Sequence, residues 1–147
     1  MTSIYVKLNN NHQPTDFPYS LTEFRSDNPG TSFPVNISDE TLADYAVHPV
    51  TATAAPTFDS KTHKVNQTAE VKNNVWTQVW TVSQLEEARA SENIRGHRDS
   101  LLKKTDYTQL TDAPGDTTAW ATYRQALRDI PAQDGFPFTV TWPTEPS

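Results

Sequence analysis

The chain of 147 residues has no cysteine and only four glycines. Without cysteine it forms no disulfide and performs no thiolate chemistry, and folding in a cytoplasmic compartment is compatible with that composition. With so few glycines it has no glycine-rich loop for binding phosphate. No apolar run approaches the ~20 residues of a membrane span, and the opening residues lack the charged and then apolar pattern of a signal peptide. We therefore expect no membrane association.

Positive charge is also scarce. The chain has 12 Lys and Arg against 18 Asp and Glu, a net charge of −6. A nucleic-acid partner is disfavoured, because clustered basic residues must meet the phosphate backbone. The aspartate–glutamate pair at 39–40 and the glutamate pair at 86–87 lie in the first turns of predicted helices, where the helix dipole explains them better than acid–base catalysis does.

Histidines are few and scattered, and none is spaced from another as metal ligands are. They are His12, His48, His63 and His97. No serine lies in the strand–turn–helix context of an activated nucleophile. We predict that the protein is not an enzyme and has no catalytic residues, no metal site and no cofactor.

Hydrophobic residues make up 35% of the chain, whereas aromatic residues alone reach 10%. Each aromatic side chain hides a large area, of order 150–250 Å². The composition therefore predicts several small clusters held by aromatic residues instead of one thick aliphatic core. Small clusters are marginally stable alone and gain from a binding partner.

We predict an α+β fold in three parts: a small α+β module over residues 1–50, a linker and β-hairpin over 51–83, and a helical hairpin with a terminal strand over 84–147. In the first part, residues 3–8 alternate as a half-buried strand does. Ser20 with Glu23 fits a capping box at the start of a short helix, and Ser38 is placed to cap a second helix.

The middle part contains the clearest β-hairpin, which spans residues 62–82 and turns at 72–74. Residues 51–56 are small and without period, so they form either a linker or an edge strand. Trp76 and Trp80 share one face of the second strand. That face is either the core of the hairpin or a docking surface for a partner.

The last part predicts two helices separated by a break at 111–116, because proline and glycine interrupt helical geometry there. The first helix is expected to begin at Ser83 or Gln84 and to run towards Lys104. Ile130-Pro131 is expected to end the second, and the aromatic segment up to Trp142 is expected to form a strand.

One stripe of the second helix carries Trp120, Tyr123 and Leu127, at positions i, i+3 and i+7. The stripe either packs inside the helical hairpin or inserts into a groove of a partner. Arg124 and Arg128 flank it, either as a solvated edge or as part of an interface. We predict that these five residues, with Trp76 and Trp80, are the candidate partner-binding residues.

The last third of the chain resembles the bacteriophage tail assembly chaperone-like domain. The residues that carry this resemblance are Arg98–Leu102, Thr105–Leu110, Ala119–Pro131, Gly135–Pro137 and Trp142–Pro143. Tyr107 stands where many relatives have tryptophan, which implies that an aromatic plug is kept at that position. Residues 17–21 and Phe33-Pro34 are similar to the leader that often precedes the domain.

The resemblance implies a non-enzymatic assembly chaperone for the phage tail fibre. Its expected partner is the fibre protein, expected as a trimer, with further copies of the chain itself as a second possible partner. It would act in the host cytoplasm and then remain on the fibre in the virion tail. The alternatives are a purely structural tail or baseplate protein without a chaperone role, and a host-directed factor or enzyme on the same scaffold.

Overall fold

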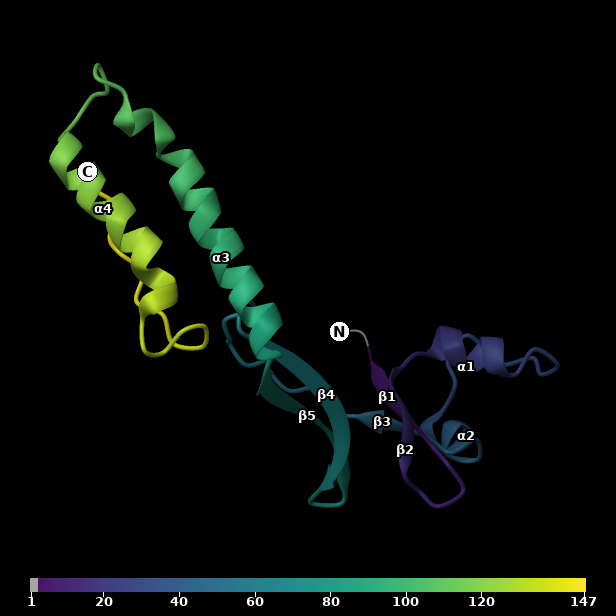
Figure 1. Ribbon diagram of the computed structural model, residues 1–147. Coiled ribbons are helices and arrows are strands. Elements are labelled where there is room, and N and C mark those ends of the chain that lie inside the picture. The colour runs from purple at the N-terminus through teal and green to yellow at the C-terminus, as the bar shows by residue number, and fades with distance from the viewer. Residues whose placement is uncertain (1–2) are drawn as a thin grey trace. The chain divides into compact units, whose positions relative to one another are not determined.

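The computed structural model describes residues 3–147, which form an α+β fold as predicted. The chain folds into two compact units (Figure 1). Unit 1 takes the chain up to Thr57 together with Val65–Val82, and unit 2 consists of Phe58–Lys64 and Ser83–Ser147. None of the helices in the described residues is long and apolar enough to cross a membrane.

Unit 1 contains a three-stranded antiparallel sheet with β1 (Ile4–Leu8) between β2 (Pro14–Tyr19) and β3 (Val47–Val50). The sequence did not predict β3, because it has only four residues and contains Pro49. Proline has no N–H for a β-ladder and therefore normally argues against a central strand. Here β3 is an edge strand of the sheet and pairs only with β1, and its two valines are buried.

Two short helices follow the predicted capping signals. The helix α1 (Leu21–Asp27) has the full capping box: the Glu23 N–H donates to Ser20 Oγ, and the Ser20 N–H donates to the Glu23 carboxylate at 2.8 Å. The helix α2 (Asp39–Ala43) begins with the Thr41 N–H donating to Ser38 Oγ. Both caps are confirmed.

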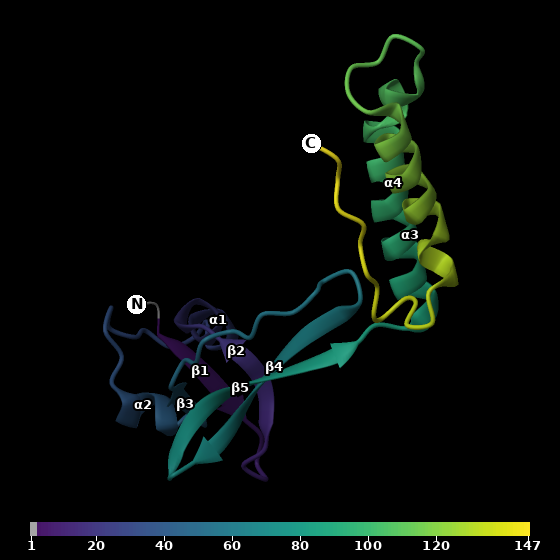
Figure 2. The ribbon, with the colours of Figure 1, turned by 90° about the vertical axis from the view of Figure 1, so that its left-hand side faces the viewer.

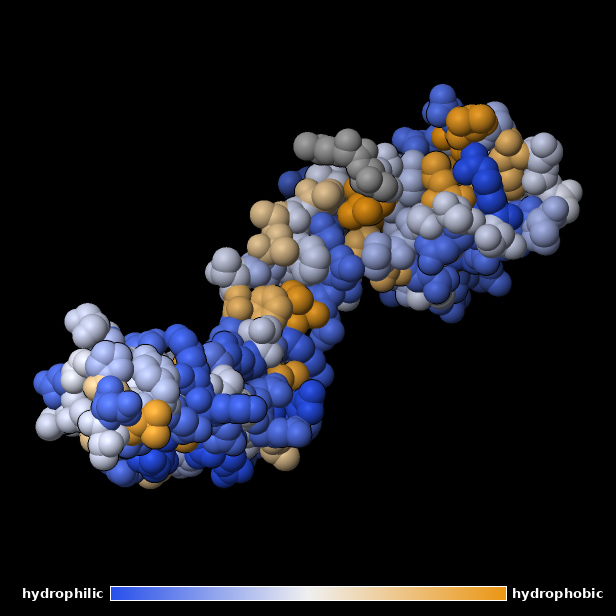
Figure 3. All heavy atoms as spheres, turned by 90° about the horizontal axis from the view of Figure 1, so that it is seen from above, coloured by the Kyte–Doolittle hydropathy of each residue, from blue (hydrophilic) through white to orange (hydrophobic). Residues whose placement is uncertain are grey.

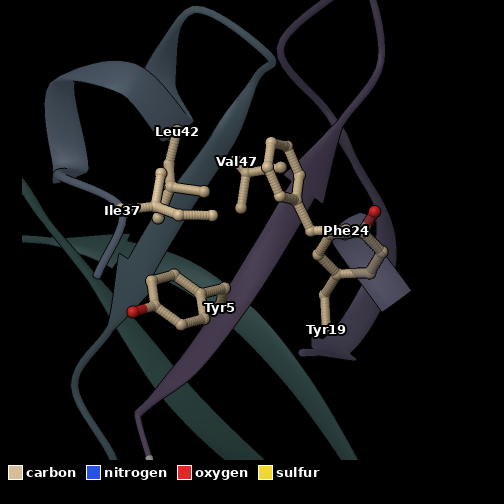
Figure 4. Close-up of a cluster of buried hydrophobic side chains, with 6 residues drawn as sticks. All are labelled: Tyr5, Tyr19, Phe24, Ile37, Leu42 and Val47. Carbon is tan, nitrogen blue, oxygen red and sulfur yellow. The ribbon is translucent and has the colours of Figure 1, made fainter. Parts of the chain in front are cut away.

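The two helices lie against one face of the sheet and enclose the first core cluster (Figure 4). It consists of Tyr5, Tyr19, Phe24, Ile37, Leu42 and Val47. Val6 and Leu8 point to the opposite face, where they are also buried, together with Ala69 and the half-buried Trp76. The prediction of a half-buried β1 is wrong, because residues of the β-hairpin cover its second face.

That β-hairpin pairs β4 (His63–Lys72) with β5 (Val75–Gln84) and confirms the prediction. Asn73 and Asn74 form its two-residue turn with φ of 50° and 62°. A turn with positive φ at both positions matches the twist of the flanking strands, and asparagine tolerates that conformation better than most residues do.

The segment 51–56 begins as an edge beside β5. The Thr51 N–H donates to the Trp76 carbonyl at 2.8 Å, and the Gln78 N–H donates to the Thr51 carbonyl at 2.9 Å. The Thr53 N–H then donates to the Gln78 side chain at 3.0 Å. Beyond Thr53 the segment has no regular structure, so the edge interpretation holds for its first three residues only.

Unit 2 is a helical hairpin of α3 (Glu87–Lys104) and α4 (Thr117–Asp129), which run antiparallel (Figures 1 and 2). A 3₁₀ turn, η1 (Asp106–Gln109), follows α3, and a second, η2 (Ile130–Ala132), follows α4. Asp116 caps α4 by accepting from the N–H groups of Thr118 and Ala119. The helical hairpin and its break are therefore confirmed.

The expected start of the first helix at Ser83 or Gln84 is wrong. The strand β5 continues to Gln84, and the Leu85 N–H donates to the Thr62 carbonyl at 2.8 Å. Backbone pairing with the preceding strand therefore holds these residues extended until Glu86, which is the N-cap. This pairing depends on a residue more than 20 positions earlier, so the local helix signal did not reveal it.

The expected terminal strand is also wrong. Residues 133–147 contain a turn and an extended segment, with no strand among them. Prolines at 137, 143 and 146 lack the N–H groups that a β-ladder needs. Instead the Gln133 side-chain amide accepts from the Thr141 N–H at 2.8 Å and donates to the Thr141 carbonyl at 2.9 Å.

Candidate functional site

The residues of the candidate stripe lie in the hydrophobic core of unit 2. Trp120, Tyr123 and Leu127 are buried between the helices with Ile94 and Ile130. The Trp120 and Tyr123 rings meet edge to face, with centroids 5.9 Å apart. Of the two interpretations of the stripe, the structure therefore places these side chains inside the helical hairpin. Burial also raises the pKa of the Tyr123 hydroxyl, since the charged form would be poorly solvated there.

The C-terminal segment completes that core. Val140 and Trp142 pack against it, and the Trp142 ring lies edge-on to His97 with centroids 4.8 Å apart. Arg95 lies over the Phe136 ring, 5.3 Å from its centroid. These contacts add to the apolar surface that α3 and α4 bury against each other.

Arg124 is the least expected member of the site. Only 6% of it is exposed, so the prediction of a solvated edge is wrong for this residue. Its guanidinium donates to the Leu102 carbonyl at 2.6 Å and to Thr105 Oγ1 at 2.9 Å. It also donates to the Asp106 carboxylate at 2.8 Å. One side chain on α4 thereby binds the last turn of α3 and the first residue of η1.

Two buried threonines extend this network. Thr105 Oγ1 donates to the Leu101 carbonyl at 2.9 Å, and Thr108 Oγ1 donates to the Thr105 carbonyl at 2.6 Å. Arg124 Nε is buried and has no partner in the described part of the chain. A buried guanidinium is costly unless it is well hydrogen-bonded, and the bonds of Arg124 offset that cost while they fix the path of the segment after α3.

The other predicted site residues lie in different settings. Arg128 is exposed on α4. In unit 1, Trp76 packs against the second face of the sheet and stacks on His48, with centroids 6.5 Å apart. Trp80 is half-buried and donates its indole N–H to the Thr53 carbonyl at 3.3 Å. Both tryptophans therefore have packing roles within unit 1, and their role in partner binding stays a prediction.

A hollow in unit 1 is lined by several ionisable groups, including Lys7, Tyr19, Glu23 and Asp27. Lys7 and Tyr19 both donate to the Asp27 carboxylate, at 2.6 and 2.7 Å. These hydrogen bonds, that from Lys7 first, hold the pKa of Asp27 below its usual value. Burial and the bond to Asp27 raise the pKa of Tyr19. Because these groups hydrogen-bond to one another, their arrangement is explained by their role in stabilising unit 1.

No group of three or more histidine and acidic side chains between residues 3 and 147 is close enough to share a metal ion.

The family model of the phage tail assembly chaperone protein matches residues 91–147. This segment is phage tail assembly chaperone-like. The match confirms the resemblance of the last third of the chain, and it covers most of α3, all of α4 and the C-terminal segment packed against them. No curated protein and no solved structure matches the chain. A family of this kind indicates a role in phage tail assembly.

Sequence reasoning missed two exposed residues of the chaperone-like segment. Tyr107 was expected to form an aromatic plug, but half of it is exposed, because η1 turns Thr108 inwards and Tyr107 outwards. Leu110 is exposed to a similar degree and was assigned no role. Their position in the sequence could have indicated this exposure. Both are large apolar residues next to the polar, proline-containing break, and neither belongs to the apolar stripe of a predicted helix.

Proposed function

We propose that the protein is a non-enzymatic assembly chaperone that binds the phage tail-fibre protein. The observation that carries the proposal is the match of the phage tail assembly chaperone family to residues 91–147. These residues form a helical hairpin whose aromatic core is closed by its own C-terminal segment. Such a hairpin has its core covered before it meets a partner.

The physical need for a chaperone follows from how multi-chain fibres assemble. A subunit that is stable only in its assembly exposes apolar surface and unpaired strand edges until its partners arrive, and such species aggregate. A small folded protein that covers part of this surface lowers the concentration of the aggregating species. We propose that this takes place in the host cytoplasm, where fibre chains are made.

Co-expression tests the chaperone role. The fibre protein produced alone should be insoluble or fail to form trimers, and co-production of this chain should rescue soluble trimers. A matched control is the same chain with Trp120→Ala, which removes the centre of the unit 2 core and should not rescue. Normal fibre trimers in the absence of the chain would remove the chaperone role and leave a structural tail protein.

Retention on the fibre is a separate proposal. If the chain stays in the virion tail, mass spectrometry of purified particles should find it at a fixed ratio to the fibre protein. Absence from intact particles would make it a transient assembly factor, with the chaperone role unaffected.

The binding region can be located by hydrogen exchange of the full chain with and without the fibre protein. We expect new protection at exposed amides within residues 91–147, where the family match lies. Protection confined to β4 and β5, around Trp76 and Trp80, would move the binding region to the β-hairpin. Of the predicted partner-binding residues on α4, Arg128 is exposed and accessible to a partner.

A further inference from the structure

The end of the helical hairpin, residues 105–116, carries exposed apolar surface that unit 2 does not use. We call this segment the hairpin tip. Tyr107 is 52% exposed and Leu110 is 60% exposed. On the face of the molecule in Figure 3, hydrophobic residues form separate patches in a mostly hydrophilic surface. Single exposed apolar residues are ordinary, but these two lie only three positions apart on one short loop.

Hydrogen bonds hold the hairpin tip in one conformation. The Thr108 N–H donates to the Thr105 carbonyl at 3.1 Å, and the Leu110 N–H donates to the Tyr107 carbonyl at 3.2 Å. The Arg124 guanidinium binds Thr105 and Asp106 from α4, as described above. The two apolar side chains are therefore presented on an ordered loop, so little conformational entropy remains to be lost when a partner binds.

The exposed side chains of the hairpin tip offer a reason for the hydrogen bonds of the buried Arg124. A helical hairpin with an apolar core needs no buried guanidinium for stability, since a buried ionic group of this kind often gains nothing over an apolar side chain of similar size. What Arg124 adds is a fixed path for the chain directly after α3. That path orients Tyr107 and Leu110 towards solvent.

The charge of the hairpin tip indicates the chemistry of its partner. Residues 105–123 contain Asp106, Asp112 and Asp116 and no lysine, arginine or histidine. Lys103 and Lys104 precede the tip at the end of α3, and Lys104 lies 3.3 Å from the Glu145 carboxylate. Asp106 is paired with Arg124 and Asp116 caps α4, which leaves Asp112 as the exposed acidic group of the tip. A tip with a negative charge beside an aromatic and an aliphatic side chain is complementary to an apolar pocket with basic residues at its edge.

We infer that the hairpin tip is a docking surface, in which Tyr107 and Leu110 enter an apolar pocket rimmed by lysine or arginine on the tail protein that the chain binds. The inference rests on the proposed function and names the surface that performs it. Tyr107 and Leu110 supply the buried contact area, and the negative charge of Asp112 favours the correct approach. Arg124 is a positioning residue that acts through the loop.

The test uses the full chain and the purified fibre protein, with affinity measured by titration calorimetry. The double variant Tyr107→Ala, Leu110→Ala should weaken binding about 30-fold, the effect of losing one interface hot spot of about 2 kcal/mol. Circular dichroism and the melting temperature should be nearly unchanged, because both side chains are exposed. The matched control is Val71→Ala, Val75→Ala, which removes similarly exposed apolar residues from unit 1 and should leave the affinity within about twofold.

Charge is tested separately with Asp112→Lys on the exposed part of the tip. It should slow association several-fold at low salt, with the difference shrinking as salt is added. A photo-cross-linking residue in place of Leu110 gives a readout that does not depend on loss of affinity. It should form a covalent adduct with the fibre protein, whereas the same residue in place of Val75 should not.

The outcomes separate this inference from the proposed function. If the wild-type chain does not bind the fibre protein, the proposed function fails. If the wild type binds and the folded Tyr107/Leu110 variant binds equally well, with no adduct from position 110, the inference is wrong while the proposed function stands. An equal loss in the Val71/Val75 control would also overturn it, because the effect would then not belong to the tip.

Discussion

Replacing Arg124 with alanine should destabilise unit 2 and leave unit 1 intact. The side chain is nearly fully buried and joins α4 to α3 and η1 through three hydrogen bonds. Arg128 lies one helical turn further on and is exposed. Alanine variants of Arg124 and Arg128 therefore compare two arginines on the same helix that differ in burial.

The expected magnitude follows from the three bonds taken in turn. The bond to Thr105 Oγ1 is buried and the bond to the Leu102 carbonyl is partly buried; both are charge-assisted, and each contributes about 1–1.5 kcal/mol net. The bond to Asp106 contributes less, about 0.5 kcal/mol, because 64% of that carboxylate side chain is exposed and solvent screens the pair. Leu102 keeps a backbone donor in Thr105, so no acceptor is stranded. The sum is about 3 kcal/mol.

Urea unfolding followed by tryptophan fluorescence, together with calorimetry, measures this loss. For a unit of this size, about 3 kcal/mol corresponds to a fall in melting temperature of about 12–24 °C. Arg128→Ala should change stability by less than about 0.5 kcal/mol. Arg124→Lys should lie between the two, because it keeps the charge but lacks the planar fork that reaches several acceptors at once.

A loss below about 0.5 kcal/mol in Arg124→Ala would refute the reasoning. It would mean that desolvation of the guanidinium offsets the whole network, as happens for some buried ion pairs. A loss shared equally by the unfolding of both units would also contradict it, because the bonds of Arg124 all lie in unit 2.

Further predictions concern each unit in turn. Trp120→Ala should cost about 3–5 kcal/mol and abolish the separate unfolding of unit 2 in calorimetry, since the indole is buried. Ser20→Ala should cost about 1 kcal/mol in urea unfolding of unit 1, because it removes a helix cap, while Ser26→Ala serves as the control within α1. The pKa of Asp27 is lower in the folded than in the unfolded protein, so its ionised carboxylate stabilises the fold at neutral pH. This stabilisation is present above the unfolded pKa and is lost as pH falls through the folded pKa. The melting temperature of the wild type should therefore fall more than that of Asp27→Asn when the pH is lowered from 7 to about 3.

Short-range signals in the sequence predicted local structure well. The capping box of Ser20 and Glu23, the asparagine turn of the β-hairpin and the proline–glycine break between the helices each depend on atoms within a few residues. The periodic stripe of Trp120, Tyr123 and Leu127 likewise defined one face of a helix. The resemblance of the last third was carried by residues in their order along the chain, and the family match confirmed it.

Predictions failed where a residue's setting depends on distant parts of the chain. Ser83 and Gln84 stay extended because β5 continues through them, and Leu85 next to them bonds to Thr62. Residues near Trp142 form no strand because prolines remove donors and the packing site along the helices is aromatic rather than a sheet edge. In unit 1, β3 forms only because β1 is there to pair with it.

The sequence by itself determined that this protein has an α+β fold, a helical hairpin and a chaperone-like C-terminal segment. Tertiary structure alone decided which residues are left for a partner. The stripe around Trp120 and the guanidinium of Arg124 are buried, whereas Tyr107 and Leu110 are exposed. The physical reason is that residue type and spacing fix which residues share a face, but burial depends on what other elements supply to cover that face.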